Sequence, residues 1–140
     1  TALIALDRIT DGASDGYVTM AQMKKASILI NKNQIEEGLA IYLDLEQTAV
    51  DQSFKDISTI LYVLNAMNHE SPELLLEKIE RLTKNNAWMF SALELKGFIF
   101  MKSKQFIKAK EVFEEIIKKN NAPTTLSGRA RDMLEHLKGI

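Results

Sequence analysis

Two histidines, each beside a glutamate, are the residues of this chain with the clearest potential for chemistry. His69 precedes Glu70, and His136 follows Glu135. An imidazole and a carboxylate could hold a metal ion together. A metal site, however, needs three or four ligands at regular spacing, and neither pair has a third ligand near it in the sequence. We therefore predict that both histidines are surface residues and that the chain has no metal site.

Other catalytic patterns are incomplete or absent in the sequence. The segment from Asp11 to Gly16 is similar in composition to a calcium loop. It lacks a third regularly spaced oxygen ligand and a closing glutamate, so we predict a turn. There is no cysteine, no glycine-rich phosphate loop and no arrangement typical of a Ser–His–Asp triad. We predict a non-enzymatic protein without a cofactor; a small metal-dependent hydrolase on a helical frame is the alternative class.

The length of the chain bounds the number of domains, and its charge limits the kinds of partner that it could bind. The 140 residues, 46% of them apolar, suit one domain with its own core. Basic and acidic residues nearly balance, and the net charge of −1 argues against a nucleic-acid partner. The densest basic stretch, residues 102–119, also carries three glutamates, so we predict an ordinary solvated helix face. No apolar run could cross a bilayer, and because the chain starts at Thr1 we expect any membrane anchor to lie upstream.

A pattern of small and larger apolar residues occurs twice in the chain and predicts the helix pairs that would position a binding surface. Gly97 lies three residues before the aromatic Phe100, and Ala109 lies four residues before Phe113. A second copy of this pattern lies 71 residues earlier in the chain. Half of that offset is about the period of a tetratricopeptide repeat, roughly 34 residues. Small residues at these places let two antiparallel helices pack closely, and the larger ones fill the space beside them. Seventy-one residues earlier, the same spacings hold Ala26, Leu29, Gly38 and Tyr42.

Apolar residues recur at helical spacing along the chain, and no segment shows sustained strand alternation. Ser71 and Pro72 are typical of a helix start, and Pro123 of a helix end. We predict an all-α fold, an α-solenoid forming a single domain over residues 1–140; an up-down bundle is the alternative. It would have an N-terminal flanking helix (1–12), three tetratricopeptide-like helix pairs (16–120) and a C-terminal capping helix (124–140). The predicted helices are Ala2–Ile9, Tyr17–Asn31, Gln34–Ala49, Phe54–Asn68, Pro72–Lys84, Ala87–Lys102, Gln105–Lys119 and Leu126–Leu137.

Two sets of residues follow from this arrangement. The first helix of each pair would line a concave surface, which predicts an apolar, methionine-rich groove for a helix or an extended peptide. A terminal helix of the same chain could instead cover this surface, or a second copy could in a homodimer. We also expect Trp88 to be largely buried and Arg129 to pair with an acid of the third repeat. The groove residues are Met20, Met23, Ile57, Ile60, Leu61, Leu64, Met67, Leu95, Phe98 and Met101, and the repeat-packing residues are Ala26, Gly38, Tyr42, Leu75, Trp88, Gly97, Phe100, Ala109 and Phe113.

Short segments spread over nearly the whole chain carry a family resemblance. They are Gly16-Tyr17 with Ala21 and Ala26, Phe54 to Ile57, Trp88 with Ala92, Glu94 and Leu95, the Gly97/Ala109/Phe113 set, Ala122-Pro123 and Gly128 to Leu134. In these the chain resembles the tetratricopeptide-like soluble domain of bacterial inner-membrane proteins related to the ancillary SecYEG translocon subunit, in an alphaproteobacterial variant. It departs from that pattern at Gly38, where the repeat usually has alanine, and in the middle repeat, whose small residues are larger apolar ones.

The resemblance implies a setting and a class of partner. Such proteins have one transmembrane helix, which this chain would lack, and carry this domain in the periplasm. The implied function is a non-enzymatic interaction scaffold of the cell envelope that assists secretion or membrane-protein biogenesis. Its partners would be translocon, chaperone or other envelope proteins. An outer-membrane assembly or TolA-binding-type adaptor is the alternative.

Overall fold

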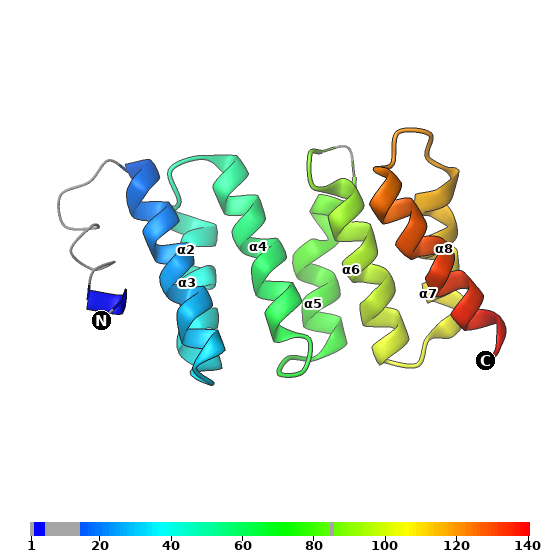
Figure 1. Ribbon diagram of the computed structural model, residues 1–140, viewed down its shortest axis with the longest axis horizontal. Helices are drawn as coiled ribbons and strands as arrows, with labels where there is room; N and C mark the ends of the chain where they lie inside the picture. The colour runs from blue at the N-terminus through cyan, green and yellow to red at the C-terminus, as the bar shows by residue number, and fades with distance from the viewer. Residues whose placement is uncertain (1, 5–14, 85) are drawn as a thin grey trace. The chain divides into compact units, whose positions relative to one another are not determined.

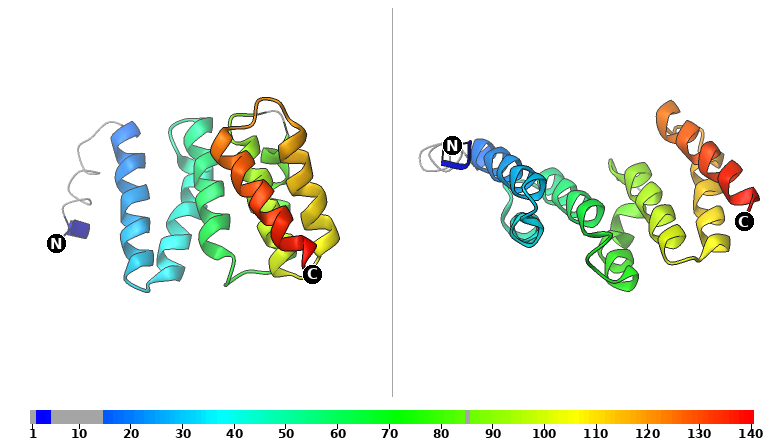
Figure 2. Two further views of the ribbon diagram at one scale, coloured as in Figure 1. Left: turned by 45° about the vertical axis from the view of Figure 1, so that its right-hand side comes forward. Right: turned by 60° about the horizontal axis from the view of Figure 1, so that its bottom comes forward.

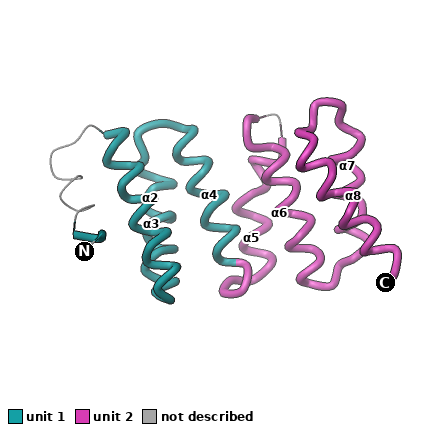
Figure 3. The backbone as a smooth tube through the Cα atoms, in the orientation of Figure 1, with its two compact units in different colours: residues 1–66 teal, residues 67–140 magenta. Residues whose placement is uncertain are grey.

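The computed structural model describes residues 2–4, 15–84 and 86–140, and this part of the chain is helical with no strand (Figure 1). The predicted all-α class is confirmed. Contacts divide the chain into two compact units, residues 1–66 and residues 67–140 (Figure 3). Of the predicted N-terminal flanking helix, residues 2–4 are helical and the remainder lies outside the described residues.

Unit 1 contains helices α2 (Asp15–Asn31), α3 (Ile35–Thr48) and α4 (Gln52–Ala66). Helix α3 packs against both α2 and α4 and lies between them in the left view of Figure 2. The interior includes Ala26 and Tyr42, as the repeat pattern predicts. Both α2 and α4 begin two residues earlier than predicted.

Unit 2 contains α5 (Pro72–Ile79), the 3-10 helix η1 (Glu80–Thr83), α6 (Met89–Lys102), α7 (Phe106–Lys118) and α8 (Thr124–Lys138). Helix α7 packs against α6 and α8, and α5 and η1 pack against α6. The N-terminus of α5 is capped as predicted, because the Ser71 side chain accepts a hydrogen bond from the Leu74 N–H at 3.2 Å. The helix predicted over residues 72–84 is wrong in its second half, since the α-helix gives way to η1 after Ile79.

Two turns, one between α2 and α3 and the other between α6 and α7, share a backbone conformation and a hydrogen-bonding pattern. Asn33 and Lys104 both adopt the left-handed conformation, with φ of 64° and 60°. The next residue closes each turn: the Gln34 N–H donates to the Leu29 carbonyl at 2.9 Å, and the Gln105 N–H donates to the Phe100 carbonyl at 2.8 Å. The sequence pattern that recurs at an offset of 71 residues therefore corresponds to a repeated local structure.

The small residues of the repeated pattern lie at close helix contacts. A β-carbon at Gly38 would come within 2.6 Å of Ile30 Cγ1 and 2.9 Å of the Ala26 carbonyl oxygen. At Gly97 it would come within 2.6 Å of Phe113 Cζ. These contacts confirm the close approach predicted for the first and third helix pairs. The second predicted pair has one helix in each unit, and its packing stays a prediction.

The remaining repeat-packing residues are mostly interior. Trp88 is the exception, because it is half-buried where we expected it to be largely buried. It stands at the N-cap of α6, before the first helical turn, where its N–H donates to Asn86 Oδ1 at 2.7 Å. The buried members are Ala26, Gly38, Tyr42, Leu75, Gly97, Phe100, Ala109 and Phe113.

Candidate interaction surface

The buried side of helix α4 carries polar side chains beside apolar ones such as Val63 and Ala66. Asp56, Ser58 and Thr59 are all buried. Ser58 Oγ donates to the Phe54 carbonyl at 2.7 Å, and Thr59 Oγ1 donates to the Lys55 carbonyl at 3.3 Å. Bonding one turn back along the same helix satisfies these hydroxyls without water or a second helix. Asp56 accepts from Gln52 Nε2 at 2.8 Å in the same local way.

The other side of α4 is apolar and faces outward. Leu64 is 53% exposed, and Ile57 and Leu61 are half-buried. The positions 57, 61 and 64 recur every three or four residues, so they lie in one stripe along the helix. Phe54, also half-buried, continues this stripe toward the N-terminus of the helix. We call Phe54, Ile57, Leu61 and Leu64 the α4 strip.

No charged residue occurs in α4 from Ile57 to its end. Leu64 is exposed and its neighbours in the strip are partly exposed, so apolar side chains with no charged residue beside them after Asp56 reach the surface, and apolar surface patches usually mark interaction sites. Ile60, also a predicted groove residue, is 9% exposed and belongs to the interior of unit 1.

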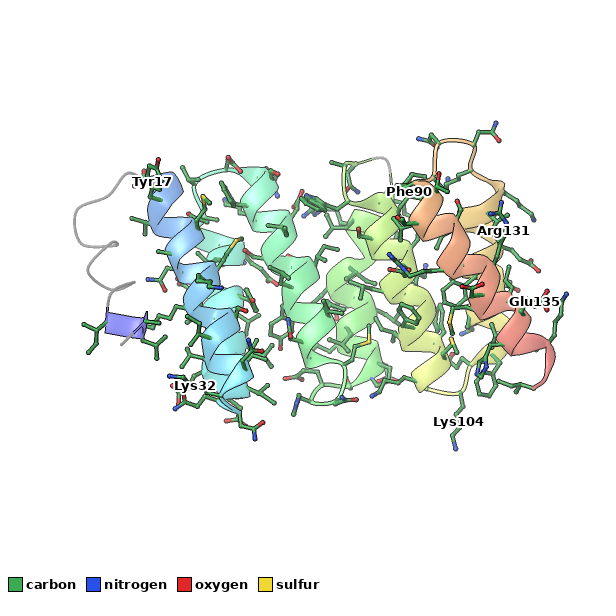
Figure 4. All side chains as sticks on the ribbon, in the orientation of Figure 1. Tyr17, Lys32, Phe90, Lys104, Arg131 and Glu135 are labelled. Atoms are coloured by element: carbon green, nitrogen blue, oxygen red, sulfur yellow. The ribbon has the colours of Figure 1, made fainter. Side chains whose placement is uncertain are left out.

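Helix α2 adds exposed apolar residues to the same unit. Met20 is 57% exposed and Met23 is half-buried. Lys24, next to Met23, is exposed and is the charged residue closest to this pair in the sequence. Tyr17 is also exposed and projects from the start of the helix in Figure 4. Since α2 and α4 both pack on α3, unit 1 has two helices with outward apolar side chains.

The predicted groove residues of α6 lie in unit 2 and are more deeply packed. Leu95 is buried, and Phe98 and Met101 pack against the core cluster of the unit. The Phe98 ring meets the Phe113 ring edge-on at a centroid distance of 5.8 Å. Because α8 contacts both α6 and α7, these side chains contribute to the interior of the unit. Met67, just beyond α4 and within unit 2, is half-buried.

A charged pair joins α8 to α6. Arg129 Nε donates to Glu94 Oε2 at 2.7 Å and Arg129 Nη2 donates to Glu94 Oε1 at 3.0 Å. This two-pronged geometry confirms that Arg129 pairs with an acid of the third repeat. The Glu94 side chain is 15% exposed and that of Arg129 is 55% exposed. The hydrogen bond with Glu94 and its negative charge raise the pKa of Arg129, against a small lowering by burial.

Both histidines, His69 and His136, are exposed. Among the described residues, no three His, Cys, Asp or Glu side chains lie close enough together to hold a metal ion. Residues 11–14 of the turn predicted over Asp11 to Gly16 lie outside the described residues. The last two residues of that segment, Asp15 and Gly16, belong to helix α2. Within the described part of the chain, no helix combines the length and apolar character needed to span a membrane.

Comparisons with family models, with curated proteins and with solved structures find no match for this chain.

Proposed function

We propose that the protein is a non-enzymatic scaffold that binds another protein through the outward faces of α2 and α4 in unit 1. In this proposal the helix pairs are tetratricopeptide-like, with α2 and α4 as the first helices of successive pairs. The ligand is an amphipathic helix or an extended peptide that places apolar side chains on the α4 strip. Met20 and Met23 suit such a surface because methionine adapts its shape to different partners.

One observation carries this proposal: α4 is apolar on its outward side as well as over most of its buried side. A helix that only stabilised unit 1 would be expected to be polar on its outward side. The local hydrogen bonds of Ser58 and Thr59 show how the buried polar side chains are accommodated. Folding leaves Leu64 exposed and Ile57 and Leu61 only partly covered, and burial by a partner would remove the remaining apolar surface from water.

The bacterial-envelope setting belongs to the same proposal and is supported by the sequence resemblance. It makes envelope proteins, such as translocon components and chaperones, the first partners to test. An outer-membrane assembly adaptor remains the alternative setting, and it would use the same apolar surface.

Site-specific crosslinking in cells tests the proposed surface. A photoreactive phenylalanine analogue at Leu64 should give a defined covalent product whose protein component mass spectrometry identifies. The matched position is Leu43 on α3, which is an exposed leucine outside the α4 strip and is 41% exposed. The same analogue there should give no such product.

Binding of the purified partner then provides the quantitative test. Leu64→Ser should weaken binding by roughly tenfold or more, because it removes the most exposed apolar side chain of the α4 strip. Leu43→Ser should leave binding unchanged. Equal crosslinking at both positions, or equal affinity of both variants, would show that the α4 strip is not the binding surface.

A further inference from the structure

The turn between α6 and α7 combines exposed lysines with an exposed isoleucine. Lys102, Lys104, Lys108 and Lys110 are all exposed, and no acidic residue occurs from Leu95 to Lys110. Ile107 stands among them and, at 79%, is the most exposed of the large apolar side chains in the described residues. Lys104 projects from the turn away from the body of the protein (Figure 4).

Acidic residues lie near two of these lysines without pairing with them: Lys108 lines a hollow with Glu111 and Glu115, and Lys110 lines another with Glu114 and Glu135. None of the four makes an ion pair with any described residue. Lys108 has a different contact, since its Nζ lies 5.8 Å from the centre of the Phe100 ring. The three glutamates of α7 begin at Glu111, within one helical turn of Lys108 and Lys110, so the stretch without acidic residues is the turn itself and the first residues of α7.

The turn between α2 and α3 has the same backbone conformation as the turn between α6 and α7 but has other residues at the positions of the exposed lysines and isoleucine. At the 71-residue offset, Asn31 and Asn33 correspond to Lys102 and Lys104, and Glu36 and Glu37 correspond to Ile107 and Lys108. Both glutamates are exposed, as their counterparts are. The left-handed conformation also suits Asn33 better than Lys104, because asparagine tolerates positive φ more readily than lysine does. Neither the fold nor backbone preference accounts for lysine at position 104.

We infer that the α6–α7 turn docks on the surface of an anionic lipid bilayer. The lysines would lie over the negatively charged headgroups, and Ile107 would enter the interfacial region between them. Clusters of lysine are attracted to anionic leaflets, and an inserted apolar side chain adds to that attraction. Beside Ile107 there is a shallow open hollow of about 350 Å³, lined by Lys104 to Lys108, which leaves the turn free to lie against a broad surface.

The chemistry of the turn favours lipid over the other anionic partners. Recognition of a single phosphate or carboxylate commonly uses the planar arginine side chain, and no arginine occurs from residue 82 to residue 128. Single-stranded nucleic acid is usually bound by exposed aromatic rings, whereas Phe106 is half-buried and packs against the core of unit 2. Flexible lysines on both sides of one aliphatic side chain in the sequence, two of which line the hollow beside Ile107, fit a diffuse negative surface with an apolar layer beneath it.

Vesicle co-sedimentation with the whole chain tests this inference. The protein should bind vesicles of phosphatidylglycerol and phosphatidylcholine, and binding to pure phosphatidylcholine should be at least roughly tenfold weaker. Added salt should release it, because the attraction is screened over about 10 Å at 0.1 M. No preference for the anionic vesicles would overturn the inference. So would tighter binding to polyglutamate or to a single-stranded oligonucleotide, because either result would assign the turn to a protein or a nucleic acid.

Two double variants with the same change in net charge separate the contribution of the turn to vesicle binding from that of the overall charge. Lys104→Asn with Lys108→Glu gives the turn the residues of its counterpart, and it should reduce vesicle binding by roughly tenfold or more. Lys84→Glu with Lys118→Asn makes the same charge change at exposed positions away from the turn, and it should bind as the wild type does. Equal loss in both variants would show that net charge alone drives the binding and would overturn the assignment to the turn.

The reverse change keeps the test independent of any loss of folding. Asn33→Lys, Glu36→Ile and Glu37→Lys give the turn between α2 and α3 the basic and apolar character of the other turn, and they should increase binding to anionic vesicles. An unchanged affinity would contradict the inference. Leu64→Ser should not alter vesicle binding, so failure of the membrane test and failure of the proposed protein-binding surface remain distinguishable.

Discussion

The Phe113 ring of α7 occupies the space that a side chain at Gly97 of α6 would need. A β-carbon at Gly97 would come within 2.6 Å of Phe113 Cζ and 2.7 Å of Cε1. Phe113 is itself fully buried, and its ring also meets Phe98 edge-on. The ring therefore has little freedom to move away, and the close packing of α6 and α7 depends on the absence of a side chain at position 97.

Adding one methyl group at this contact should destabilise unit 2. We expect Gly97→Ala to lower the free energy of unfolding by about 1–3 kcal/mol, since overpacking a rigid core costs more than the helical preference of alanine gains. Gly128→Ala in α8 is the matched control, because nothing lies within 4 Å of the added carbon there. That variant should be more stable by about 0.5–1 kcal/mol. Urea unfolding monitored by fluorescence of Trp88 compares the two; an equally stable Gly97→Ala would contradict the contact.

Phe98 and Leu64 should respond differently to the same polar substitution. Phe98 packs against the core cluster and Phe113, so Phe98→Ser should lower the free energy of unfolding by about 1–3 kcal/mol. Leu64 is 53% exposed, so Leu64→Ser should change it by less than about 0.5 kcal/mol. Thermal unfolding measured by circular dichroism provides the comparison. A large loss for Leu64→Ser would mean that the outward stripe of α4 is part of a core.

The pair formed by Arg129 and Glu94 should contribute modestly to stability. We expect Arg129→Ala to cost about 0.5–1 kcal/mol, at the upper end for a surface pair, because the largely buried Glu94 carboxylate loses two hydrogen bonds. Arg131→Ala, two residues further along α8, is the control. A double-mutant cycle with Glu94→Gln isolates the coupling, which should shrink as salt is added. A coupling energy of zero at low salt would show that the pair adds nothing.

Tyr42 should make the protein less stable at alkaline pH. Its burial raises the pKa of the phenol above the ordinary value of 10.0. The unfolded state then loses its proton first, so this contribution to stability is complete below about pH 10 and is lost as the pH rises through the folded-state pKa. Stability of the wild type should fall more steeply from about pH 9 to pH 11 than that of Tyr42→Phe. Tyr17→Phe changes an exposed tyrosine and should keep the wild-type dependence.

The sequence by itself determined the helical class and the positions of most helices. The regular recurrence of apolar residues and local signals such as Ser71 and Pro72 act within one or two turns of the chain, so they can be interpreted without a tertiary structure. The repeated pattern around Gly38 and Gly97 likewise predicted close helix contacts, whereas the hydrogen-bonding pattern that the two turns share emerged only from the structure. The end of α5 was missed because the change to a 3-10 helix at Glu80 has no strong local signal.

Tertiary structure decided which apolar residues are covered. Leu64, Phe98 and Met101 are all apolar residues at helical spacing, but Leu64 is 53% exposed whereas Phe98 and Met101 pack against the core cluster of unit 2, which residues of α7 and α8 help to form. The bonding of Glu94 with Arg129, 35 residues away, has the same origin. Exposure and long-range pairing depend on which other segments approach a helix, and periodicity along one helix holds no information about them.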